Sequence, residues 1–157
     1  MDNSNPPLFC LLIKNTWQKL SRYYNHRFAA YELTVPKALL ILEMSPDKGE
    51  NPTSLANKLD LESSSMTGLL DRLEKKGLSE RKKDPNDRRG VLIYLTPAGC
   101  LARERIKTLV DELDRKLQET IPAEDVKTFR RVSSIINKTL SQLNDSVANE
   151  ICKAGDR

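Results

Sequence analysis

The stretch SLANKLDLESSSMTGLLDRLEKKGLSERKKDPNDRRGVLIYLTPAG, residues 54–99, decides the fold. Its first part predicts a short helix over residues 53–60, with Thr53 as the N-cap. A serine-rich joint then leads into a second helix, whose apolar residues recur at helical spacing: Met66, Leu69, Leu70 and Leu73. Gly77 follows two lysines and is typical of the residue just beyond a helix end.

Beyond Gly77 the pattern changes from helical to strand-like. Residues 78–82 and 91–95 are strand candidates, and the second is rich in β-branched and aromatic residues. Residues 83–90 between them combine turn-forming residues with cations. Two short helices followed by a basic β-hairpin is the order of a winged helix-turn-helix. The sequence therefore predicts a mainly α fold with a small β-hairpin wing.

The segments on either side predict longer helices. Residues 5–7, Asn-Pro-Pro, indicate a helix start, and from Phe9 to Tyr31 apolar residues recur at helical spacing. Thr34 is expected to cap a helix over residues 35–45, and Thr96-Pro97 to begin one that reaches about Glu119.

The last helix is expected to begin near Pro122, and its apolar residues repeat every seven positions. One register holds Phe129, Ile136 and Leu143, and the other holds Val126, Leu140 and Val147, with Ser133 as a polar exception. We expect residues 1–33 and 97–157 to form a helical dimerisation lobe and residues 34–96 the winged helix-turn-helix, in one continuous domain. The alternative is a helical bundle within a single chain.

The composition is that of a well-solvated globular protein: of 157 residues, 38% are hydrophobic and 31% are charged. The longest apolar run, residues 38–42, is far short of the ~20 residues that cross a bilayer. No basic segment precedes the apolar residues near the N-terminus, so no secretory signal is expected. We expect a cytoplasmic protein with no membrane partner.

Residue types that carry enzymatic chemistry are sparse. Three cysteines without CxxC spacing argue against a disulfide scaffold or a zinc module, and His26 is the single histidine. The sequence has no phosphate-binding glycine loop, no HExxH motif and no paired metal ligands. We therefore expect a protein that is not an enzyme and that uses neither a cofactor nor a metal.

Positive charge is concentrated in residues 72–90. Eight Lys and Arg residues against four acids give this segment +4, whereas the 18 basic and 18 acidic residues elsewhere cancel. This concentration points to a polyanion, and an α-helix fits the major groove of double-stranded DNA. The residues expected to contact DNA lie on the exposed face of the second helix and on the hairpin: Ser64, Ser65, Thr67, Gly68, Arg72, Lys75, Lys82, Lys83, Arg88 and Arg89.

Each residue type in this set has a physical reason to contact DNA. Hydroxyl groups bond phosphates or bases, Gly68 permits close backbone approach, and a hairpin arginine enters a narrow minor groove. Two alternatives stay open. Lys75 and Lys76 could simply solvate a helix end, and Asp71 and Glu74 could pair with some of the cations.

Residues 54–99 resemble the MarR family of transcription regulators, most specifically in DPNDRRGVLIYLTPAG and in the preceding LLDRLEKKGLSER. The flanking helices match the family in length and order. The resemblance implies a homodimer that binds a palindromic operator, often represses transcription and responds to a small-molecule effector. It also implies that Asp87 orients Arg89 toward a minor groove. A different class, a winged helix that binds protein partners through its hairpin, is the alternative.

Effectors of MarR-like regulators are often anionic or aromatic. Trp17, Tyr24 and Phe28 could line a pocket for one, or could form the core of an interface, which we favour. His26 is expected to be a partly exposed helix residue.

Cys10 suggests a second kind of switch. One branch of the family senses organic hydroperoxides through a cysteine at the start of the first helix, where a thiol has a lowered pKa. Of the tyrosines that accompany that cysteine only Tyr24 is present, and the other two positions hold Lys14 and Val35. The alternative for Cys10 is a buried structural cysteine.

Overall fold

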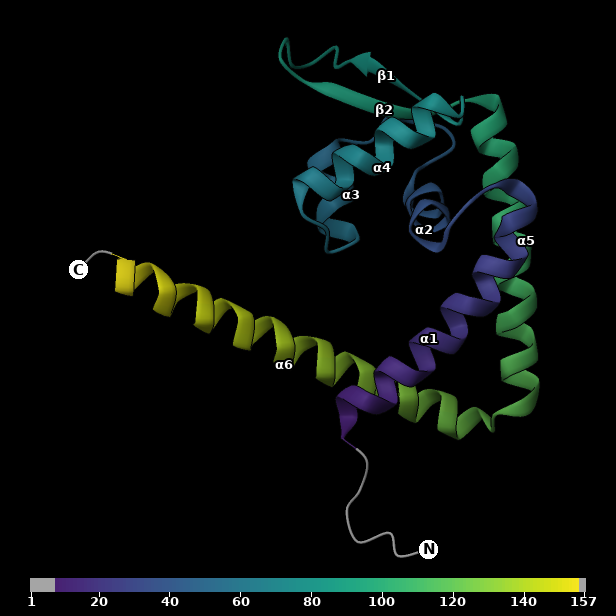
Figure 1. The fold of residues 1–157 in the computed structure, drawn as a ribbon, viewed down its shortest axis with the longest axis vertical. Coiled ribbons are helices and arrows are strands. Elements are labelled where there is room, and N and C mark those ends of the chain that lie inside the picture. Colours follow the sequence, from purple (N-terminus) through teal and green to yellow (C-terminus); the bar gives the residue numbers. More distant parts are fainter. Residues whose placement is uncertain (1–7, 156–157) are drawn as a thin grey trace, which may run out of the picture. The chain divides into compact units, whose positions relative to one another are not determined.

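The computed structural model describes the backbone of residues 8–155, with side chains described for residues 8–144 and 146. The elements in chain order are α1 (Phe9–Phe28), η1 (Ala29–Tyr31), α2 (Val35–Glu43), α3 (Pro52–Lys58), α4 (Ser63–Lys75), β1 (Ser79–Lys83), β2 (Val91–Leu95), α5 (Pro97–Thr120) and α6 (Ala123–Gly155) (Figure 1). One compact unit ends at Val110 and a second begins at Asp111. None of the described helices is both long enough and apolar enough to span a membrane.

The helix starts differ from the sequence prediction in one instructive place. The N-cap of α3 is Asn51 rather than Thr53, and its Oδ1 accepts the N–H groups of Thr53 at 2.8 Å and Ser54 at 3.3 Å. Pro52 has no N–H to satisfy, so it takes the first helical position and moves the cap one residue upstream of itself. The expected start of α1 at residues 5–7 lies outside the described residues.

Helix α2 begins after Thr34, as expected, but the Thr34 side chain makes no capping bond. The side chain of Asn25 on α1 supplies an acceptor there, because its Oδ1 takes the N–H of Val35 at 3.1 Å. Helix α2 ends at Glu43, two residues before the predicted position, and Arg103 of α5 donates to the carbonyls of Leu42 and Met44.

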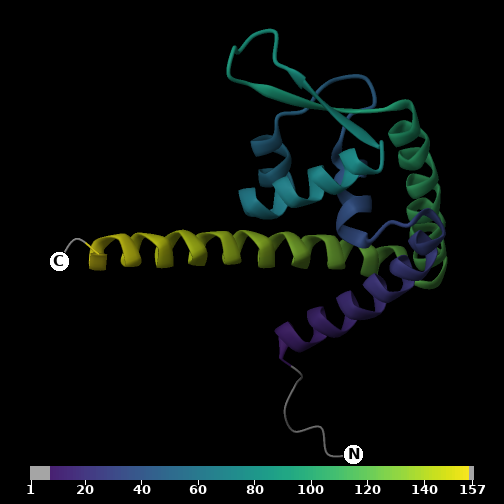
Figure 2. The ribbon, with the colours of Figure 1, turned by 45° about the horizontal axis from the view of Figure 1, so that its top comes forward.

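Gly77 ends α4 as predicted, with a φ of 67° that a side chain would strain. The strands pair antiparallel, with Ser79 opposite Leu95 and Lys83 opposite Val91. β1 thus begins one residue later than expected. The loop of this hairpin projects away from α3 and α4 (Figure 2).

The base of the hairpin is fixed to the start of α5. The Thr96 hydroxyl donates to the Gly77 carbonyl at 2.5 Å and accepts the Gly99 N–H at 3.1 Å. A Cβ at Gly99 would lie 1.9 Å from the Leu78 carbonyl oxygen, so only glycine permits this approach. The hairpin and α5 are therefore joined at a fixed point.

The hydrophobic core of the first unit is built from α2, α3, α4 and β2, together with Phe28 of α1 and Ile106 of α5. Leu40, Ile41, Leu55 and Leu73 are 0% exposed, and Ile93 of β2 is 1% exposed. All four residues of the predicted α4 stripe are buried. This core therefore fixes which face of α4 remains available to solvent.

The second unit, by itself, leaves its apolar residues largely exposed. Phe129, Leu140 and Leu143 are 71%, 52% and 56% exposed, while Ile136 and Ser133 are half-buried. The side chain of Val147, the last position of the predicted seven-residue repeat, lies outside the described residues. The start of α1, in the first unit, is similar, because Phe9 is 73% exposed.

Candidate DNA-binding surface

The face of α4 opposite its buried stripe carries polar residues. Ser64, Ser65, Thr67 and Arg72 are exposed, and Gly68 is half-buried with open space where a Cβ would stand. The Thr67 hydroxyl donates to the Ser63 carbonyl at 2.9 Å and retains its acceptor lone pairs. The structure therefore brings the α4 members of the predicted set to one solvent-facing side.

The cations of residues 72–90 divide into two groups. Three are held by carboxylates: Lys76 by Glu32, Arg81 by both Asp71 and Glu74, and Lys82 by Glu80. The other five have no carboxylate partner among the described residues: Arg72, Lys75, Lys83, Arg88 and Arg89. These five, which we call the unpaired cations, are all exposed.

Lys82 is the member of the predicted set that is most restrained. Its Nζ lies 2.7 Å from Glu80 and 5.0 Å from the centre of the Tyr94 ring. The hydrogen bond to Glu80 raises the pKa of Lys82. Its charge is thus partly offset at the surface.

Arg81 is bound more firmly than any other cation of the segment. Its Nη2 lies 2.7 Å from the Asp71 carboxylate and its Nη1 2.5 Å from that of Glu74. The hydrogen bond to Asp71 and the charge of Glu74 raise the pKa of the Arg81 guanidinium. The expectation that Asp71 and Glu74 pair with cations is therefore met by a residue of the hairpin.

The wing loop is organised by two aspartates. Asp84 Oδ1 accepts the N–H of Asn86 at 2.8 Å, and Asp87 Oδ1 accepts the N–H of Arg89 at 2.9 Å. Asp87 therefore holds the backbone of Arg89. Arg88 and Arg89 extend from a loop whose turn is fixed.

The three aromatic residues considered for a ligand pocket do not share one site. Tyr24 stacks on Phe28 with ring centres 5.3 Å apart and planes within 5°, and Phe28 is 2% exposed. Trp17 is 51% exposed instead. Tyr24 and Phe28 therefore contribute to the core of the first unit within one chain, whereas the favoured alternative was the core of an interface.

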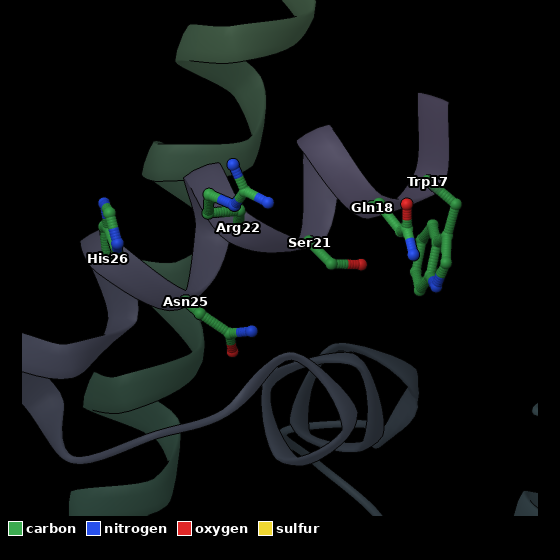
Figure 3. Close-up of a pocket in the computed structure, with 6 residues that line it drawn as sticks. All are labelled: Trp17, Gln18, Ser21, Arg22, Asn25 and His26. Atoms are coloured by element: carbon green, nitrogen blue, oxygen red, sulfur yellow. The ribbon is translucent and has the colours of Figure 1, made fainter. Parts of the chain in front are cut away.

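Trp17 lines an open groove along α1 of about 410 Å³ (Figure 3). The other lining residues are Gln18, Ser21, Arg22, Asn25 and His26. Ser21 Oγ is buried without a hydrogen-bond partner among the described residues. Sequence reasoning missed these neighbours, although Ser21 and Asn25 follow Trp17 at the i+4 and i+8 positions that share a helix face.

Cys10 lies in the first turn of α1 and is exposed in the single chain. Val35, at one of the positions where the peroxide-sensing branch has tyrosine, is 4% exposed. Tyr24 is stacked on Phe28. The redox alternative is not favoured. Among the described residues no group of metal-ligating side chains occurs.

Comparison with known proteins places this surface in context. The MarR family model matches residues 37–91. The multiple antibiotic resistance protein MarR of Escherichia coli strain K12 is 31% identical over 119 residues, which cover 75% of this chain and 83% of that protein. The organic hydroperoxide resistance transcriptional regulator of Bacillus subtilis is 26% identical over 86% of this chain and 90% of its own length. A crystal structure of a mutant E. coli MarR complexed with operator DNA matches with a TM-score of 0.72 and 29% identity, covering 80% of this chain and 90% of that one.

Proposed function

The chain belongs to the MarR family, and on this premise we propose that it is a dimeric repressor that binds a palindromic operator and releases it when a small molecule binds. The observation that carries the proposal is the set of five unpaired cations beside the exposed polar face of α4. Cations without protein partners are available to phosphates, which dominate the affinity of proteins for DNA. A protein with this partner acts where the chromosome is, in the cytoplasm.

In the proposed complex α4 enters the major groove. Ser64, Ser65 and Thr67 lie near its N-terminal end, where helix residues approach base edges and phosphates. Arg72, one further turn along, reaches a guanine or a phosphate. The wing loop places Arg88 and Arg89 at the neighbouring minor groove, whose narrow A·T-rich form attracts guanidinium groups.

The proposed dimer follows from apolar faces that the single chain leaves exposed. Phe9, Leu12 and Ile13 on α1 are 73%, 48% and 51% exposed, and α6 separately exposes Phe129 and Leu143. Large exposed apolar patches mark interaction sites. A second copy of the chain would cover both faces, and two-fold symmetry would match the protein to an inverted repeat.

The DNA proposal is tested by selecting duplexes from a random-sequence pool with the native protein. We expect an inverted repeat, and a log K that falls steeply with log salt. Arg89→Met should weaken binding mainly at A·T-rich flanks, whereas Arg72→Met should relax preference at one or two base pairs. Lys138→Met on α6, also an exposed cation, is the matched control and should bind as the native protein does. Failure to enrich any duplex would contradict the proposal and favour a protein-binding winged helix.

The α1 groove is the site we propose for the effector. Trp17 offers a ring for stacking, Arg22 a positive charge, and Ser21 an unpartnered hydroxyl. These features suit a small aromatic anion. Because Trp17 is the single tryptophan, its fluorescence reports occupancy directly. Benzoate should quench it and release DNA, and Arg22→Met should abolish both effects while Arg27→Met retains them. Quenching that persists in Arg22→Met would place the anion elsewhere.

A further inference from the structure

Arg81 occupies an unusual place among the cations of the hairpin. Cross-strand pairing sets it opposite Ile93, which is 1% exposed, and it shares its side of β1 with the buried Ser79. This side of the strand faces the core and α4. Lys83 lies two residues further along the same side but extends into solvent.

The guanidinium of Arg81 spans two carboxylates on adjacent turns of α4. Asp71 and Glu74 are three residues apart and so lie on the same side of that helix. One guanidinium nitrogen takes each carboxylate, at 2.7 Å and 2.5 Å. A planar fork holds this geometry, which a single ammonium group cannot span.

We infer that Arg81 is a positioning residue for DNA binding, which holds the wing against α4 through Asp71 and Glu74 and makes no contact with DNA itself. The inference rests on the proposed function. Without this link, α4 and the wing loop lose their fixed relation at the hairpin, and Arg88 and Arg89 reach their groove less often. The two carboxylates also become uncompensated beside the α4 surface that faces the phosphates.

The decisive experiment neutralises an acid, because a positioning role and a purely electrostatic role predict opposite changes in the affinity for DNA. Removing a negative charge near DNA strengthens binding if charge alone matters. Asp71→Asn instead breaks one arm of the link, and we expect it to weaken binding to the selected duplex roughly three- to tenfold. The matched control is Glu62→Gln at the N-cap of α4, an exposed acid with no ion pair among the described residues. It should bind at least as tightly as the native protein.

A second measurement separates positioning from direct contact. Arg81→Met should lower affinity while the slope of log K against log salt stays at the native value. Lys83→Met, on the same side of β1, should reduce the slope by about 0.9 if it neutralises one phosphate. Adding Asp71→Asn to Arg81→Met should cause no further loss, since both changes break the same link. Circular dichroism checks that each variant is folded. If Arg81→Met does not fold, the affinity of Asp71→Asn for DNA tests the positioning role by itself.

The outcomes are distinct. Tighter or unchanged binding by Asp71→Asn, weaker binding by Glu62→Gln, or a reduced salt slope for Arg81→Met would each overturn the inference. If the native protein selects no duplex at all, it is the proposed DNA-binding function that fails. If the native protein binds and Arg81→Met binds equally well, only the positioning role fails.

Discussion

Similar apolar residues are buried in the winged part of the chain and exposed in its C-terminal helical part. Leu73 on α4 is 0% exposed, whereas Leu143 on α6 is 56% exposed. Both belong to apolar repeats with helical spacing. The difference lies in what surrounds them, because α2, α3 and β2 cover α4 within one chain, while the described part of α6 lacks such cover. The first region completes its core alone, and the proposed dimer would cover the second.

The largest effect is expected from a substitution in the exposed apolar face of α6. Leu140→Arg would place an unpaired charge in the proposed dimer interface, at a cost of about 3–5 kcal/mol. Sedimentation equilibrium should show a dimer for the native protein and a monomer for the variant. Ser134→Arg, at an exposed position on the opposite side of α6, is the control and should remain dimeric. A native protein that sediments as a folded monomer at micromolar concentration would remove the basis of the comparison.

The next effect distinguishes the two regions by how the loss of stability depends on protein concentration. Leu73→Ala removes a fully buried side chain and should lower the free energy of unfolding by about 2–5 kcal/mol. This loss should be the same at every protein concentration. Leu143→Ala should destabilise only through the dimer, so its loss should shrink as the protein is diluted. Urea unfolding at two protein concentrations measures the stability loss of both variants. If the two losses depend on concentration to the same extent, the distinction between the two regions is wrong.

Much of the winged region could be predicted because local and long-range signals agree there. The stripe of α4, the stop at Gly77 and the cap at Thr96 each depend on residues within a few positions. Asn51 was missed because Thr53 is also a good cap, and only the role of Pro52 as the first helical residue decides between them.

The candidate site was less predictable, because which cations remain unpaired depends on distant partners. Lys76 meets Glu32 across 44 positions, and Arg81 meets Asp71 across ten. Composition shows the sum of these charges but not their pairing. The aromatic residues of α1 show the same limit, since the stacking of Tyr24 on Phe28 separates them from Trp17.

A smaller effect tests the corrected start of α3. Asn51→Ala removes the side chain that accepts two N–H groups and should cost about 1 kcal/mol. Thr53→Ala should cost less, because the Thr53 side chain is exposed and does not cap the helix. Urea unfolding above the dimer dissociation constant compares the two. A larger loss for Thr53→Ala would restore the cap predicted from the sequence.

The smallest effect concerns the surface pair of Glu32 and Lys76, which ties the segment before α2 to the end of α4. The hydrogen bond from Lys76 lowers the pKa of Glu32 below its ordinary value of 4.5. The carboxylate is therefore favoured in the folded state, so the stabilisation is complete above the ordinary pKa. It disappears as the pH falls through the lowered one.

The pair is tested by comparing Glu32→Gln with the native protein in urea across this pH range. The variant should be slightly less stable at neutral pH, and the difference should vanish in acid as the native carboxylate gains its proton. Because both side chains reach solvent, added salt should also reduce the difference. Glu43→Gln, which removes an exposed acid without an ion pair among the described residues, is the control and should show no such pH dependence. A difference between Glu32→Gln and the native protein that stays constant from neutral pH into acid would mean that the side chain acts by packing. Charge at this junction would then contribute nothing to the stability of the winged region.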